Sequence, residues 1–463
     1  MNISQKLTPF SQSVLHPAAK IALRSAAMQL GVRDFSISAS GLARPGGVNA
    51  HLARLTVAVW GGSAQPVTHL LGVAPTEPAA RGKAGRGVKM AQQTLRDFPH
   101  IYGRLRRWSE WVFASEWSQA QLLQVMEEIE LMVAEALMWD SLASVAAVGS
   151  YVHLGGQIAK FEKDRVRAHA LRLGLTAGLE TPAGRLIEAL ALDETPEQLR
   201  KRFGHMAVQP EGELAMPRIG EMAETLRGAS PAPEPLMWDI SRAQGRQDEA
   251  MRNAMAAAGF LGRSSLRKAV ELAQASLITH AKARDALAFV LAAARHWAQA
   301  AAAEGMSDAR IQHPREIFML EIEEIKQMMT GEWHTRDRIA PLIALRQEAY
   351  DQEPPLGEVG SIGPLGVAGP ATQGALLPLR MPDDVSPPSG FVALVKDWSP
   401  AWWRVLLMSE GVIAPGGDLL SWIVSVARMG DLPALVGGAE YASWPPKVMI
   451  RLDPGRNQAE KVA

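Results

Sequence analysis

The chain has 463 residues, of which 47% are hydrophobic, enough for two or three domains with buried cores. Its 48 Lys and Arg residues balance 48 Asp and Glu residues, so the net charge favours neither nucleic acid nor an anionic membrane as a partner. The absence of cysteine from the sequence excludes disulfides, thiolate metal sites and a cysteine nucleophile. The N-terminus lacks the pattern of a signal peptide, and the apolar stretch from Leu131 to Leu154 is interrupted by Glu135, Asp140 and His153. We therefore expect a soluble, cytoplasmic protein.

The N-terminal region is expected to combine one helix with a small strand-containing piece. Apolar residues recur at helical spacing from Leu7 to Leu30, behind a Thr8-Pro9 start that suits the first turn of a helix. Residues 34–75 alternate short apolar runs with glycine and proline, which indicates strands. Residues 80–89 form a basic, glycine-rich loop that is not a Walker A motif, because no Lys-Ser or Lys-Thr pair follows its last glycine. We interpret it as a solvated loop, with a phosphate clamp as the alternative.

The region from Met90 to Tyr350 has a helical pattern nearly throughout, with long amphipathic stretches over Gln119–Ala147 and Ser265–Glu304. Its aromatic and methionine stripes are typical of a core, and it has no strict heptad repeat, so we expect a globular helical bundle. Proline and glycine then crowd together up to Gly374, which marks a linker into a new domain. The expected fold class is α+β, a large mainly helical domain followed by a small α/β domain. The predicted divisions are residues 1–90, 91–351, 352–374 and 375–463.

Near the C-terminus, a strand, a tight turn and a helix are predicted in succession. The apolar run Gly411–Ile413 leads into the turn Pro415-Gly416-Gly417. A helix is predicted over Asp418–Met429, with Asp418 as its N-cap, and the apolar run Leu432–Val436 closes the unit. Because free backbone N–H groups and the helix dipole point at one spot, this arrangement is a ready anion site.

This stretch resembles the swivelling phosphohistidine domain of the phosphoenolpyruvate-utilising enzymes, such as phosphoenolpyruvate synthase, pyruvate phosphate dikinase, rifampin phosphotransferase and phenylphosphate synthase. The positions that match the family pattern are Gly411, Gly417, Ser421, Ala427, Arg428, Pro433, Ala434 and Gly437. The phosphate-carrying histidine of the family falls on Trp422, its threonine on Ala414 and the second glycine of its Gly-Gly pair on Asp418. Residues 391–395 resemble another strand of the same domain. An indole has no basic ring nitrogen, so Trp422 cannot carry a phosphoryl group. The resemblance leaves a remnant of the phosphate site at Gly416, Gly417, Ser421 and Arg428.

The resemblance also suggests roles for the four divisions of the chain. The L-T-P-F segment at residues 7–10 is similar to the entry of the family's central substrate domain, which follows its ATP-grasp domain. We therefore expect the ATP-grasp domain to be absent or carried on another chain. By the same resemblance, residues 1–90 begin the central domain and residues 91–351 are its helical substrate-binding part. Residues 352–374 are the hinge and first part of the mobile domain, and residues 375–463 are the swivelling domain.

The helical region carries a second resemblance to the family. Residues 202–206 read R-F-G-H-M, and residues 213–218 read E-L-A-M-P-R. A histidine beside a carboxylate can deprotonate a hydroxyl that attacks a phosphoryl group. The resemblance therefore makes His205, Glu213 and Arg218 catalytic candidates, with Arg218 holding anionic oxygen. The alternative for His205 is a structural histidine that hydrogen-bonds a loop to the bundle.

Two further arginines are candidates for substrate binding. Arg202 belongs to the second motif, and Arg284 lies in a stretch that loosely resembles a basic stretch of the family. A solvated helix face is the alternative for Arg284. The sequence contains no H-E-x-x-H, E-x-x-H or D-x-D pattern, so no metal site is expected.

Three functions remain open. The first is a degenerate, phosphoenolpyruvate synthase-like pseudoenzyme, the substrate-binding or regulatory subunit of a phosphotransferase system with a separate ATP-binding chain. The second is an active phosphotransferase on a small hydroxylated or aromatic substrate that uses His205. The third is a small-molecule binding protein or a repurposed enzyme on this fold. We expect this chain to bind no cofactor, with ATP or phosphoenolpyruvate and Mg held by the partner chain.

Overall fold

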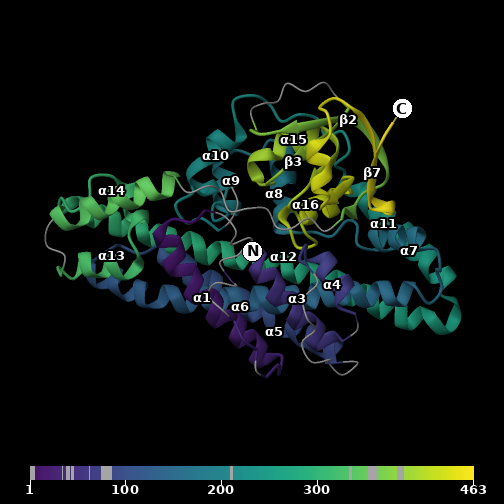
Figure 1. Ribbon diagram of the computed structural model, residues 1–463, viewed down its shortest axis with the longest axis horizontal. Coiled ribbons are helices and arrows are strands. Elements are labelled where there is room, and N and C mark those ends of the chain that lie inside the picture. The colour runs from purple at the N-terminus through teal and green to yellow at the C-terminus, as the bar shows by residue number, and fades with distance from the viewer. Residues whose placement is uncertain are drawn as a thin grey trace.

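The computed structural model describes residues 6–33, 35–37, 42, 46–61, 63–74, 86–208, 212–332, 336–352, 363–382 and 390–462. We call residues 6–352 the helical body and residues 363–462 the sheet unit. Figure 1 shows the sheet unit lying against one side of the helical body, with α13 and α14 at one end of that body and the C-terminus on the sheet unit. The predicted α+β class is confirmed, because among the described residues helices fill the body and every strand of the sheet lies in the C-terminal unit.

Two long helices form the centre of the helical body, α6 (Gln119–Ile158) and α12 (Gly259–Ser307). They pack against each other and against α1 (Pro9–Gln29) and α5 (Arg86–Phe113). The contact is fixed by Trp297, a fully buried residue of α12 whose indole Nε1 donates to the carbonyl of Leu122 in α6 at 2.7 Å. α6 is long and apolar enough to cross a membrane, but 78% of its most apolar window is buried inside the protein, as in the core helix of a soluble protein.

The N-terminal region differs from the sequence prediction, because the described part of residues 34–75 forms helices and no strand. α3 (Gly47–Trp60) and α4 (Ala64–Leu70) occupy this region. The buried apolar residues of α3 recur three or four positions apart, which is the spacing of a helix and which the flanking glycines conceal. They include Leu52, Leu55 and Val59.

Shorter helices complete the body. They are α7 (Arg165–Leu175), α8 (Pro182–Ala191), α9 (Pro196–Phe203), α10 (Ile219–Arg227), α11 (Ile240–Ala257), the 3₁₀ helix η1 (Pro314–Met319), α13 (Ile322–Met329) and α14 (Arg336–Gln352). α8 and α9 each begin with a Thr-Pro pair, in which the threonine caps the helix and the proline fills its first turn. Of the predicted basic loop, residues 80–85 lie outside the described residues, and residues 86–89 form the first turn of α5.

The sheet unit contains a seven-stranded mixed sheet with the order β1-β5-β4-β3-β2-β6-β7. The central strands β2 (Thr372–Leu379), β3 (Phe391–Val395), β4 (Ser409–Ala414) and β5 (Ala434–Val436) are parallel neighbours. The strands β1 (Leu365–Ala368), β6 (Met449–Asp453) and β7 (Gln458–Lys461) pair antiparallel at the two edges. The inner strands β3 and β5 are continuous apolar runs whose residues are all buried, as expected where both faces of a sheet are covered.

One face of the sheet carries α15 (Trp403–Met408) and α16 (Trp422–Gly430), which dock the unit onto the body. Of the predicted linker 352–374, residues 353–362 lie outside the described residues, and β1 and the start of β2 occupy the rest. The predicted strands at residues 391–395 and 411–413 are present as β3 and within β4.

The start of α16 differs from the prediction, because its N-cap is Ser421 rather than Asp418. Asp418 forms a turn before the helix, in which its Oδ1 accepts from the N–H of Leu420 at 2.7 Å. A carboxylate that binds the N–H two residues ahead stabilises a turn that competes with the helix, which moves the helix start along the chain. The predicted end is correct to within one residue, since the helix ends at Gly430 and Asp431 follows in the left-handed conformation with φ 52°.

Candidate functional site

Two hollows meet at α12. The first, the interdomain cavity, lies between the helical body and the sheet unit and has a volume of about 180 Å³. The second, the basic cleft, lies within the helical body among α5, α9, α10 and α12 and has a volume of about 730 Å³. One face of α12 lines the interdomain cavity and the continuation of this helix lines the basic cleft, so Asp285 belongs to both walls. The residues of α12 in the cavity wall are His280, Ala281, Arg284, Asp285 and Ala288.

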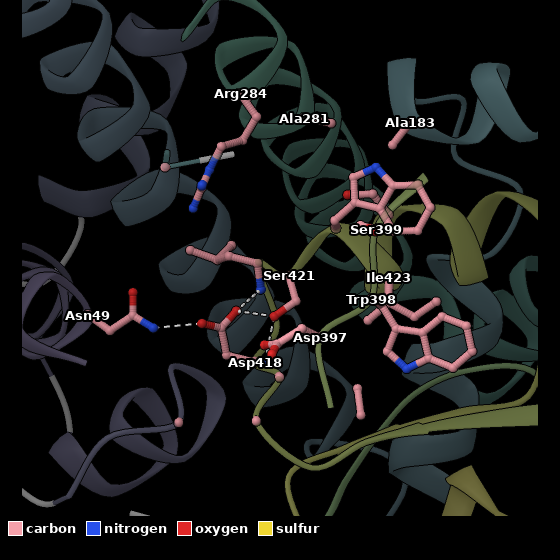
Figure 2. Close-up of a pocket in the computed structure, with 18 of the residues that line it drawn as sticks. Asn49, Ala183, Ala281, Arg284, Asp397, Trp398, Ser399, Asp418, Ser421 and Ile423 are labelled. Atoms are coloured by element: carbon pink, nitrogen blue, oxygen red, sulfur yellow. Dashed lines mark hydrogen bonds between the residues drawn. The ribbon is translucent and has the colours of Figure 1, made fainter. Parts of the chain in front are cut away.

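The N-terminal end of α16 opens into the interdomain cavity, and the carboxylate of Asp418 lies in the turn just before this helix (Figure 2). Asp418 accepts through Oδ1 from the N–H of Leu420 at 2.7 Å and from Ser421 Oγ at 3.1 Å. Its other oxygen, Oδ2, accepts from Asn49 Nδ2 of α3 at 2.6 Å. A helix N-terminus favours a negative charge, and the Asp418 carboxylate supplies that charge here while it also joins the sheet unit to the helical body.

Trp422 is the first residue of α16 and a half-buried part of the cavity wall. A second indole, Trp398, lies in the same wall and donates from Nε1 to the carbonyl of Ile413 at 3.2 Å. Gly416 and Gly417 line the cavity beside them. The structure therefore brings Trp422, Ser421, Gly416 and Gly417 together, as the family resemblance implies for the phosphate site.

Arg284 points from α12 toward the side of the cavity where Asp418 and Ser421 lie (Figure 2). Its guanidinium Nε lies 2.9 Å from Oδ1 of Asp140, a buried residue of α6. Burial alone would raise the pKa of Asp140, but the Arg284 guanidinium holds it below its usual value. Burial lowers the pKa of the neighbouring His280 to about 3, so this cavity-lining imidazole is neutral at physiological pH.

His205 lies in the wall of the basic cleft, and its carboxylate partner is Asp285. His205 Nε2 and Asp285 Oδ1 are 2.8 Å apart, and the other oxygen of Asp285 accepts from the hydroxyl of Tyr102 at 2.7 Å. The imidazole stacks on the ring of Phe289, with centroids 3.5 Å apart and an angle of 7° between the planes. Burial and the adjacent Asp285 carboxylate raise the pKa of Tyr102 well above its ordinary value, so the phenol stays protonated as a donor.

Glu213 is not brought beside His205 by a hydrogen bond. Its carboxylate accepts from the backbone N–H of Thr8 at 2.6 Å, from Thr8 Oγ1 at 2.8 Å and from Ser11 Oγ at 2.6 Å. It also accepts from the N–H of Ala215 at 2.7 Å. Glu213 therefore holds the first turn of α1 against the loop before α10, and it lines neither hollow.

The remaining predicted arginines lie in different places. Arg218 is buried at the N-cap of α10 and lines the basic cleft, as does Arg202, which is exposed and ion-paired with Glu194. Arg428 lies near the C-terminal end of α16, outside the cavity lining, where Nε donates to the carbonyl of Val367 at 3.3 Å. Burial lowers the pKa of Arg428 from its usual value. Arg428 therefore lies at the opposite end of α16 from the first turn, which lines the cavity.

Four residues of these sites escaped the sequence prediction: Asn49, Tyr102, Asp285 and Asp418. Asn49 and Tyr102 are isolated polar residues within helices, and no pattern in the sequence distinguishes them. Asp285 directly follows the predicted Arg284, and only the hydrogen bond with a histidine 80 residues away reveals its role. Asp418 was predicted only as a helix cap. The one signal in the sequence that marks it as a site residue is that it replaces a glycine of the family pattern.

No family model and no curated protein matches this chain. Among the residues that the structure describes, no three His, Asp or Glu side chains are grouped in a way that would hold a metal ion.

Proposed function

We propose that this chain is a degenerate relative of the phosphoenolpyruvate-utilising enzymes, a pseudoenzyme that binds a small ligand in the interdomain cavity and carries no phosphoryl group at position 422. In this proposal it serves as the substrate-binding or regulatory subunit of a phosphotransferase system. A separately encoded ATP-grasp chain binds ATP or phosphoenolpyruvate and Mg. The resemblance of residues 411–437 to the family pattern is the basis for the family assignment.

The observation that carries the proposal is the state of the α16 N-terminus. Asp418 places a carboxylate at the anion position, with hydrogen bonds from Leu420, Ser421 and Asn49. A phosphoryl group at Trp422 would stand at the same helix end and would meet the negative charge of Asp418. The indole offers no basic nitrogen to carry it. Both the carrier and the vacant anion position that a phosphohistidine needs are therefore missing from this site.

The lining of the interdomain cavity supports a small hydroxylated or aromatic ligand. The side chains of Trp398 and Trp422 offer flat apolar surface, and the hydroxyls of Ser399 and Ser421 offer hydrogen bonds. Arg284 and Lys396 bring positive charge and Asp397 and Asp418 bring negative charge, so the lining suits a polar ligand better than a strongly charged one. A volume of about 180 Å³ has room for on the order of ten water molecules, which limits the ligand to a small one.

Intact-mass measurement tests the proposal directly. The purified protein is incubated with phosphoenolpyruvate, or with ATP and Mg, alone and with the host cell extract. We expect no acid-labile phosphoryl adduct. The double variant Trp422→His and Asp418→Gly restores the family residues at these two positions. It is the positive control, in which an acid-labile adduct can form. An acid-labile adduct on the unaltered chain would overturn the proposal.

A second candidate is an active phosphotransferase that uses His205 as a general base. It is favoured by the hydrogen bond between His205 and Asp285, because a carboxylate that orients an imidazole is a common arrangement for proton transfer. The engagement of Glu213 with the start of α1 weighs against the predicted His205–Glu213 pair. A phosphorylated small-molecule product that the unaltered chain forms with the host cell extract, and that the His205→Gln variant does not form, would support this candidate over the first.

A further inference from the structure

We propose that the basic cleft is a second binding site, one for an organic anion in which a carboxylate or phosphate group is attached to a flat ring. The inference does not depend on the proposed function, because no residue of the α16 N-terminus takes part in it. It assigns a ligand class to a hollow that lies within the helical body alone.

The size and the walls of the cleft suit an aromatic molecule. Its volume of about 730 Å³ is within the usual range of roughly 300–1,000 Å³ for small-molecule sites. Phe289 and Phe113 line it, and Phe113 meets the ring of His296 edge to face with centroids 5.7 Å apart. Tyr102 adds a third aromatic side chain. A planar ring placed among these side chains would gain offset or edge contacts.

The charges of the lining favour an anion. Six cationic side chains face three carboxylates, and each of the three carboxylates has a partner. Glu110 is bonded to Arg106 at 2.8 Å, Glu221 is bonded to Arg295 at 2.7 Å, and Asp285 is bonded to His205 and Tyr102. The cations are Arg106, Arg200, Lys201, Arg202, Arg218 and Arg295. Glu224 and Glu194, just outside the lining, pair with Arg200 and Arg202, so an incoming anion meets a small excess of positive charge and no lining carboxylate without a donor.

The cations at the rim are able to turn toward a ligand. Arg106 and Arg202 form ion pairs with Glu110 and Glu194, and both arginines are about half exposed, with side-chain exposures of 51% and 46%. The pair of Arg106 with Glu110, half exposed on both sides, contributes roughly 0–1 kcal/mol, so a ligand oxygen can replace Glu110 at small cost, whereas Glu194 has a side-chain exposure of only 18% and holds Arg202 more firmly. Arg106 also lies over the ring of Phe289, at 5.5 Å from its centroid, which places the charge beside the aromatic wall.

The inner wall of the cleft is already ordered. His205 is held between the Asp285 carboxylate and the stacked ring of Phe289, and Arg295 holds Glu221 through two nitrogen atoms while Nη1 donates to the carbonyl of Leu214 at 2.9 Å. Burial would raise the pKa of Glu221, but its pair with Arg295 keeps the pKa below the usual value, so this pair stays charged. A wall fixed in this way loses little side-chain entropy when a ligand binds.

Benzoate and its neutral analogue benzamide test the inference, with saturation-transfer NMR as the readout. We expect saturable binding of benzoate, competition by inorganic phosphate, and about tenfold weaker binding of benzamide, because the amide carries no negative charge to pair with the arginines. The variant Arg106→Gln with Arg202→Gln should weaken benzoate about tenfold. The control Arg96→Gln with Arg107→Gln removes the same charge from the exposed surface of α5 away from the cleft, and it should leave binding unchanged.

Arg284→Gln distinguishes binding in the cleft from binding in the interdomain cavity, because Arg284 lines the cavity and not the cleft. Equal binding of benzoate and benzamide, or no saturable binding of benzoate, would overturn the inference. It would equally fail if Arg284→Gln weakened benzoate while the Arg106 and Arg202 variant did not. None of these outcomes bears on the phosphoryl adduct, so this inference and the proposed function fail independently. Circular dichroism of each variant verifies that the helices are intact.

Discussion

The carboxylate of Asp418 is expected to fix the α16 N-terminus and to hold the sheet unit on the helical body. Asp418→Ala removes the acceptor for the N–H of Leu420 and for Ser421 Oγ, and it leaves Asn49 Nδ2 with one acceptor, the carbonyl of Leu71 at 2.9 Å. The carboxylate accepts three hydrogen bonds, and a bond to a charged group contributes about 1.5–3 kcal/mol when buried and less where water reaches it. We therefore expect the local opening free energy to fall by about 2–3 kcal/mol.

Hydrogen–deuterium exchange reads this change at a specific amide. The N–H of Leu419 donates to the carbonyl of Leu70 at 2.8 Å, so its protection reports the contact between the sheet unit and the helical body. A loss of 2–3 kcal/mol should speed its exchange about 30- to 160-fold. Added inorganic phosphate should restore part of the protection in Asp418→Ala and have no effect on the unaltered chain, because only the variant has a vacant anion position.

Asp164→Ala is the matched control. Asp164 caps α7 through the N–H groups of Val166 and Arg167, so it is another carboxylate that accepts from backbone N–H groups, away from the interdomain cavity. Its replacement should speed exchange in α7 and leave Leu419 unchanged. If Leu419 exchanged at the same rate in Asp418→Ala as in the unaltered chain, Asp418 would not hold the sheet unit. If phosphate protected the unaltered chain to the same degree, Asp418 would not occupy the anion position.

Three other changes test the packing and the electrostatics. Tyr102→Phe removes a donor to the buried Asp285, and chemical denaturation should show a loss of about 1–3 kcal/mol. Trp297→Ala empties a fully buried position and should cost about 3–5 kcal/mol by the same measurement. Burial lowers the pKa of His169 to about 3, and its Nδ1 accepts from Arg172 at 2.8 Å. Because the folded state resists protonation of His169, the stability it contributes is present above pH 6.5 and is lost as the pH falls from 6.5 toward 3. His169→Gln cannot be protonated, so its stability should fall less over that range, and an equal fall in both proteins would contradict this account.

The pattern of the sequence predicted the long helices of the body and two central strands of the sheet. The predicted apolar runs 411–413 and 432–436 contain buried residues of β4 and β5, as expected of central parallel strands. The region of α3 was predicted as strands, because its apolar residues come in short runs between glycines and the helical spacing is visible only once Leu52, Leu55 and Val59 are known to face one core. The spacing of apolar residues predicts an element well only when the pattern is long enough to distinguish the period of a helix from the period of a strand.

The candidate sites were less predictable, because they depend on contacts between distant residues. A catalytic histidine is usually paired with a carboxylate, and the sequence motif predicted Glu213, eight residues after His205, as this partner. In the structure the partner is Asp285, which is 80 residues away in the chain. Glu213 is engaged by Thr8 and Ser11, about 200 residues earlier in the chain. Hydrogen bonds over such separations follow from how α1, α10 and α12 pack, and no spacing rule contains that information.

The family resemblance implies that the sheet unit swings relative to the helical body. The contacts between the two determine how freely it could do so. Among the described residues, five backbone hydrogen bonds cross this boundary, and the amide and carbonyl pairs are Leu419–Leu70, Gly178–Arg428, Asp239–Gly430, Leu236–Leu407 and Ala401–Val208. At about 0.5–1.5 kcal/mol each, they contribute roughly 3–7 kcal/mol, before the ion pair of Arg246 with Asp431 at 2.5 Å is counted.

At about 5 kcal/mol, on the order of one molecule in a few thousand would have the sheet unit released. A swinging unit that visits two sites with comparable frequency needs a second surface that replaces these contacts, and a partner chain would have to provide it. Without such a partner, the sheet unit acts as a fixed wall of the interdomain cavity. Exchange protection at Leu419, Gly178 and Asp239, measured with and without the host extract, distinguishes a fixed wall from a unit that a partner releases.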